Sequence, residues 1–136
     1  MNPALLFRFA ALSGFASVAL GAFGAHLLKS RLTPNDLEIF ETGVRYQMYH
    51  AIAAACVALA MRATGRSRPL AIAGWSFVVG TIVFSGSLYL LVLTGTRVLG
   101  AITPIGGVAL LIGWASLATV RLPRSGADES IASESL

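Results

Sequence analysis

The stretch LLFRFAALSGFASVALGAFGAHLL, from Leu5 to Leu28, decides the fold class, because only Arg8 brings a charge into it. A helix must present about 20 mostly apolar residues to cross the roughly 30 Å of hydrocarbon in a bilayer. Residues 70–93 and 98–120 also meet that length, and a shorter apolar run covers residues 46–61. We therefore predict an all-α membrane protein with four transmembrane helices in an up-and-down bundle.

The composition excludes a water-soluble globule and a disordered chain. Hydrophobic residues make up 56% of the 136 residues and charged residues only 12%, against about 25% charged residues in soluble domains. The formal charge of +4 would suggest nucleic acid in a soluble protein, but here the basic residues lie in short loops, where they set membrane orientation. The single cysteine, Cys56, excludes an intrachain disulfide, and its apolar surroundings predict a packed, inert thiol.

A helix start precedes the shortest apolar run. Thr33 has the side chain of an N-cap residue, Pro34 suits the first helical position, and Asp36 can hydrogen-bond back to the cap. Apolar residues then recur at helical spacing. We expect a short amphipathic helix before the second span, with a bend at Gly43.

The charged residues predict the domain limits and the orientation. Residues 1–122 form the predicted transmembrane domain, and residues 123–136 form a polar tail without enough apolar surface to fold, which we expect to be disordered. One set of span ends carries six basic residues and the other carries four: Arg8, Arg62, Arg66, Arg68, Arg121 and Arg124 against Lys29, Arg31, Arg45 and Arg97. This bias predicts a multi-pass protein of the cytoplasmic (inner) membrane with both termini in the cytoplasm.

Small residues mark the predicted helix contacts. They recur four and three residues apart on the first span, at Ala10, Gly14, Ser17, Gly21 and Gly24. Such a stripe allows close backbone approach, which drives helix association in lipid. Gly106 and Gly113 serve the same purpose on the fourth span. We predict helix packing at these positions.

Polar residues inside the apolar runs are the candidate ligand-binding residues, namely His26, Arg45, Gln47, His50 and Tyr89. An up-and-down arrangement is expected to bring them to one level near the outer leaflet. They have four interpretations: a hydrogen-bonded cluster that ties the helices together, a site for a headgroup or small polar ligand, a haem held by the two histidines, or an enzyme. Two histidines alone underfill a zinc site, so we predict no metal.

The sequence favours a non-enzymatic role, because no nucleophile, base and orienting group occur together. We expect a packing or assembly protein that contacts membrane lipids and associates with itself or with a larger membrane complex, and no nucleic acid or resident cofactor. The alternative is binding or transport of a lipid, quinone or small solute at the polar cluster. Haem-linked electron transfer is a weaker alternative.

Four blocks resemble one known family. They are GAFGAH (Gly21–His26), FETGVRYQMYHA (Phe40–Ala51), FSGSLY (Phe84–Tyr89) and LGAITPIGG (Leu99–Gly107). They are similar to the YgdD-like family of small bacterial membrane proteins, also known as domain of unknown function 423 or the transmembrane protein 256 type. The resemblance covers about Ala10 to Trp114. It implies an inner-membrane protein with several helical spans and no assigned activity.

Overall fold

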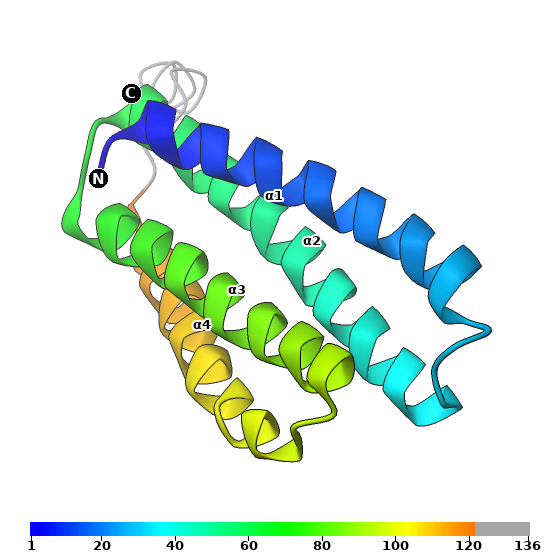
Figure 1. Cartoon of the computed structure of the whole chain (residues 1–136). Coiled ribbons are helices and arrows are strands. Elements are labelled where there is room, and N and C mark those ends of the chain that lie inside the picture. The colour runs from blue at the N-terminus through cyan, green and yellow to red at the C-terminus, as the bar shows by residue number, and fades with distance from the viewer. Residues whose placement is uncertain (122–136) are drawn as a thin grey trace, which may run out of the picture.

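The computed structural model describes residues 1–121, and in that range the chain is helical without a strand (Figure 1). Its elements are α1 (Pro3–Phe23), the π-helical turn η1 (Gly24–Leu28), α2 (Pro34–Thr64), α3 (Arg68–Thr94), the 3-10 turn η2 (Arg97–Ala101) and α4 (Thr103–Ala118). Consecutive long helices run in opposite directions, so Met1 and the end of α4 lie at the same end of the molecule. The all-α, up-and-down prediction is confirmed for the order of the helices. The tail predicted at residues 123–136 lies outside the described residues.

Three segments are long and apolar enough to cross a membrane: Pro3–Leu28, Arg68–Thr94 and Arg97–Ala118. They correspond to the first, third and fourth predicted spans. Helix α2 is not among them, because charged residues occupy its first turns and the polar Gln47 and His50 lie near its middle. A fourth crossing by α2 therefore stays a prediction.

The start of α2 corrects one expectation. The hydroxyl oxygen of Thr33 accepts the backbone N–H of Asp36 at 3.1 Å, so the predicted cap is present. The amphipathic segment is not a separate helix, however, because α2 runs unbroken from Pro34 through Gly43 to Thr64. Contacts on the neighbouring helix hold this part of α2 in line: the Ser85 hydroxyl donates to the carbonyl oxygen of Gly43 at 2.8 Å.

The helices form an open row. Helix α1 packs along α2, α2 along α3, and α3 along α4, whereas α1 and α4 have no packed contact in the part of the chain that the structure describes. The core lies where α2 and α3 meet their neighbours, and small side chains such as Ala54 and Ala58 are fully buried there. The described helices therefore do not close into a four-helix bundle, and the row leaves grooves along its sides.

The outer surface is apolar, as a bilayer requires. Large side chains such as Phe15 and Leu111 are 75% and 68% exposed. The sequence prediction of a packed thiol is wrong, because Cys56 is exposed on α2. An apolar run in a membrane protein faces lipid as often as it faces the core, so its composition did not distinguish the two.

Candidate functional site

Glycines set the distance between α3 and α4. A Cβ on Gly106 would lie 2.4 Å from the backbone nitrogen of Phe84, and one on Gly113 would lie 2.6 Å from the ring of Phe77. A Cβ on Gly80 of α3 would likewise lie 2.5 Å from the side chain of Leu110. Sequence spacing did not single out this glycine. The two helices therefore touch along their backbones, and Gly106 and Gly113 both lie in that contact.

The small residues of α1 and of the following turn η1 face α2. A Cβ on Gly21 would lie 3.4 Å from Val44, one on Gly24 would lie 3.1 Å from Phe40, and one on Gly14 would lie 4.0 Å from Ala51. Ser17 adds a hydrogen bond, donating its hydroxyl to the carbonyl oxygen of Val44 at 2.8 Å. This stripe is thus occupied by a helix of the same chain.

Gln47 links three helices. Its amide nitrogen donates to the carbonyl oxygen of Ser13 on α1 at 3.0 Å. Its amide oxygen accepts the hydroxyl of Tyr89 on α3 at 2.8 Å. Gln47 is only 9% exposed. Its bond to Ser13 is buried, where an unmade hydrogen bond is costly, and its bond to Tyr89 is half-buried. Two of the predicted ligand-binding residues, Gln47 and Tyr89, therefore form a structural link.

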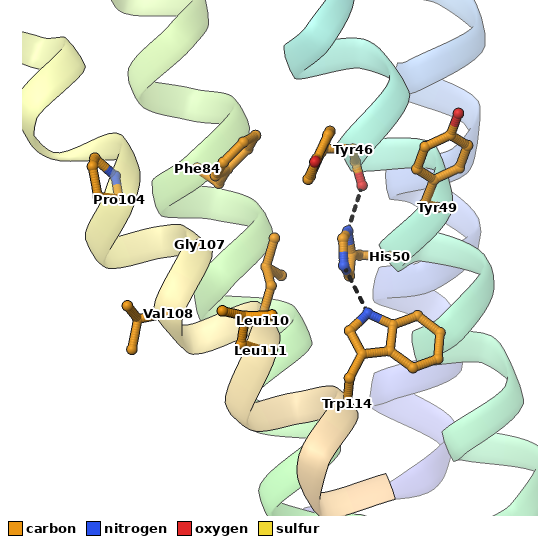
Figure 2. Close-up of a pocket in the computed structure, with 10 residues that line it drawn as sticks. All are labelled: Tyr46, Tyr49, His50, Phe84, Pro104, Gly107, Val108, Leu110, Leu111 and Trp114. Carbon is orange, nitrogen blue, oxygen red and sulfur yellow. Dashed lines mark hydrogen bonds between the residues drawn. The ribbon is translucent and has the colours of Figure 1, made fainter. Parts of the chain in front are cut away.

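His50 has both ring nitrogens engaged (Figure 2). Its Nδ1 lies 2.7 Å from the carbonyl oxygen of Tyr46, and its Nε2 accepts the indole N–H of Trp114 on α4 at 3.1 Å. This pattern assigns the proton to Nδ1, because a carbonyl oxygen can only accept and an indole can only donate. The neutral ring also packs against Phe77, with centroids 5.6 Å apart. No lone pair is left on His50 for a metal or a substrate.

His26 and Arg45 lie apart from these contacts. Both are exposed: His26 on η1, and Arg45 on α2, where its guanidinium donates to the Thr42 hydroxyl at 3.3 Å. Gln47 and His50 lie near the middle of α2 rather than in its first turns. The structure therefore does not bring the five predicted residues to one level. Within residues 1–121, no group of three or more histidine, cysteine or acidic side chains could hold a metal ion.

A groove of about 610 Å³ lies between α2 and α4, with α3 behind it (Figure 2). It exists because α4 packs along α3 and reaches α2 through the Trp114 side chain. Its lining is mostly aromatic and aliphatic: Tyr46, Tyr49, His50, Phe84, Pro104, Gly107, Val108, Leu110, Leu111 and Trp114. Sequence patterns did not reveal this site, because its lining comes from three helices and no single helix shows it.

An ion pair lies at the end of the molecule opposite Met1 and the end of α4. Arg97, before α4, lies 2.8 Å from the carboxylate of Asp36 in the first turn of α2. The guanidinium of Arg97 and the hydroxyl of Thr33 beside Asp36 hold the pKa of that carboxyl below its usual range. The pair joins the start of α2 to the loop between α3 and α4.

We expect this pair to make stability depend on pH in one direction. A lowered carboxyl pKa stabilises the fold above the ordinary Asp value of about 3.9. That contribution is lost as the pH falls further, through the pKa of the folded state. It should be small and salt-sensitive, because the Arg97 side chain is 61% exposed. Thermal unfolding of the protein and of Arg97→Gln between pH 3 and 7 checks it; a difference between the two that grows toward acid pH would contradict it.

The chain is similar to known membrane proteins along most of its length. The family described as "Protein of unknown function (DUF423)" matches residues 20–107. The UPF0382 inner membrane protein YgdD of Escherichia coli K12 is 42% identical over 132 residues, 93% of this chain and 97% of that protein. The UPF0382 membrane protein YwdK of Bacillus subtilis is 43% identical over 104 residues, 76% of this chain and 85% of that protein.

A UPF0382 membrane protein of Haemophilus influenzae is 47% identical over 108 residues, 79% of this chain and 86% of that protein. No solved structure matches the chain. The family match spans the blocks that first indicated the resemblance, from the end of α1 to the first turns of α4. The chain therefore belongs to the DUF423 family of membrane proteins.

Proposed function

We propose that this protein is a non-enzymatic binding protein of the inner membrane, and that the groove between α2 and α4 holds the apolar chain of a membrane lipid. The groove itself carries the proposal: about 610 Å³ of mostly apolar space, a size typical of ligand pockets. Four crossings with both termini in the cytoplasm complete the proposed topology. The shared position of Met1 and the end of α4 supports it (Figure 1).

The chemistry of the lining favours an apolar ligand over a polar solute. His50 and Trp114 hydrogen-bond to each other and so offer no unmade bond to a polar group. The remaining surface consists of rings and aliphatic side chains, such as Phe84 and Leu111, which suit an acyl or isoprenoid chain. A quinone could also enter by its chain, with its polar ring beside the hydroxyls of Tyr46 and Tyr49, which line the groove and make no hydrogen bond within the described chain. Because both ring nitrogens of His50 are already hydrogen-bonded, this side chain also supports a role without catalysis.

Filling the groove should remove the ligand. Gly107 lines it, and a Cβ there would lie 3.7 Å from the Phe84 ring, an ordinary contact. Gly107→Leu should therefore fold and occupy the groove. We expect the lipid occupancy of this groove to fall about tenfold, from lost apolar burial, so that the variant keeps fewer copurified lipids per chain. Native mass spectrometry of gently purified protein measures this.

The matched control is Gly86→Leu. Gly86 is also helical, and no atom lies within 4 Å of the position that a Cβ would take there, but it does not line the groove. The control should retain as much lipid as the unsubstituted protein. Equal retention by Gly107→Leu would overturn the groove proposal.

Assembly is the second candidate function. It is favoured by α4, which lies at the end of the open row and exposes Ile105 and Leu111 to 67% and 68%. The glycine stripes give less support to assembly with another chain, because Gly21, Gly106 and Gly113 already contact helices of this chain. The same mass spectra decide it: a mass of two or more chains, or of a bound partner protein, would favour assembly.

Haem-linked electron transfer has less support. The two histidines that would ligate iron are not brought together, since His26 is exposed on η1 and both nitrogens of His50 are hydrogen-bonded. We propose no cofactor. An absorption spectrum of the purified protein with a Soret band would contradict this.

A further inference from the structure

A second groove, of about 330 Å³, lies at the end of the molecule that carries the N-terminus. It runs between the first turns of α1 and the last turns of α2. Its apolar surface comes from Ala4, Phe7, Ala58 and Leu59, and two arginines, Arg8 and Arg62, line it from the two helices. Such a groove can bind an apolar chain along its walls and an anionic group between the two arginines.

The two arginines have no partner within the chain as far as the structure describes it. Neither makes a hydrogen bond or an ion pair there, whereas Arg97 pairs with Asp36 and Arg66 donates to the carbonyl oxygen of Met1 at 3.5 Å. The carboxylates of residues 1–121 all lie in the first turns of α2, at the opposite end: Asp36, Glu38 and Glu41. The charge of this groove is therefore not neutralised by described residues.

We propose that this groove binds an anionic phospholipid, with the phosphate held between Arg8 and Arg62 and an acyl chain lying along Phe7 and Leu59. Guanidinium groups bind phosphate oxygens in a two-pronged geometry. The apolar part of the groove continues onto exposed surface, since Phe7 and Leu59 are 46% and 53% exposed. A soluble anion would leave that surface unused, and a zwitterionic lipid would bring its own choline cation toward the two arginines. The inference stands apart from the groove between α2 and α4.

The test is lipid titration of the full chain in detergent, followed by native mass spectrometry. The probes are phosphatidylglycerol and phosphatidylcholine with identical acyl chains, at 0.15 M salt, where charges more than about 8 Å apart are screened. We expect clear preference for phosphatidylglycerol. The double substitution Arg8→Gln with Arg62→Gln should weaken phosphatidylglycerol binding about 25-fold, from about fivefold per arginine. It should weaken phosphatidylcholine binding much less, because the choline cation offsets the charge of the phosphate.

The matched control is Arg66→Gln with Arg68→Gln, which removes the same charge from the same end but outside the groove. It should change phosphatidylglycerol binding less than about threefold, because those charges do not touch the phosphate. An equal loss in the control, or equal affinity for the two lipids, would overturn the proposal. Arg8→Lys with Arg62→Lys keeps the charge and should restore most of the binding; a loss as large as that of the glutamine pair would also overturn it.

Discussion

Replacing Gly106 with alanine should push α3 and α4 apart and lower the free energy of unfolding by about 3 kcal/mol. The added methyl group would lie 2.4 Å from the backbone nitrogen and 2.8 Å from the Cα of Phe84. Backbone atoms cannot turn away as the end of a flexible side chain can, so one helix has to move. The groove between α2 and α4 should change shape with it, because Gly107 and Phe84 line it.

Gly86→Ala is the matched control for this expectation. It makes the same chemical change on α3, where no atom lies within 4 Å of the new methyl group. Its stability should be unchanged or slightly higher, since alanine favours a helix over glycine by about 1 kcal/mol. Thermal unfolding of both variants in the same detergent makes the comparison. Equal melting temperatures would mean that α3 and α4 are not held by backbone contact.

The second large effect is expected at Gln47. Gln47→Leu should lower the free energy of unfolding by about 2 kcal/mol, because it leaves the half-buried Tyr89 hydroxyl and the buried Ser13 carbonyl oxygen without their partner. Hydrogen bonds between membrane helices average nearer about 0.6 kcal/mol. We expect more here because one side chain joins three helices. Unfolding in detergent measures the loss.

A double-mutant cycle separates this link from simple packing. Tyr89→Phe removes only the hydroxyl, and combining it with Gln47→Leu should cost less than the sum of the two single changes. Tyr49→Phe is the control, since Tyr49 is 56% exposed and makes no hydrogen bond to another side chain in the described chain. Additive effects at Gln47 and Tyr89 would show that the bond contributes nothing.

Local sequence was enough to predict most of the secondary structure. Apolar length located three of the long helices, and Thr33 followed by Pro34 located the start of α2. The same reasoning failed at Gly43, where a separate amphipathic helix was expected to end, because α2 runs unbroken through that residue. Helix-breaking tendency at a single glycine is worth only about 1 kcal/mol, and the contact between Gly43 and α3 outweighs it.

Sequence reasoning predicted only part of the candidate site. Gln47, His50 and Tyr89 were singled out because polar side chains are rare in apolar runs. Their partners were not, since Ser13 and Trp114 come from other helices. Trp114 in particular has the position of a membrane-interface residue, near a span end. The contact with His50 depends on where α4 lies, which no local pattern reports.

The sequence by itself determined the membrane class, the family, the helical order and the residues able to pack closely, because these depend on hydropathy and spacing along one chain. The tertiary structure alone decided that the helices form an open row, that His50 faces Trp114 while Gln47 faces Ser13, and that Arg8 and Arg62 share a groove. Each of those facts depends on the rotation of one helix against another. In lipid that rotation is set by the sum of many weak contacts between helices, and no single helix contains it.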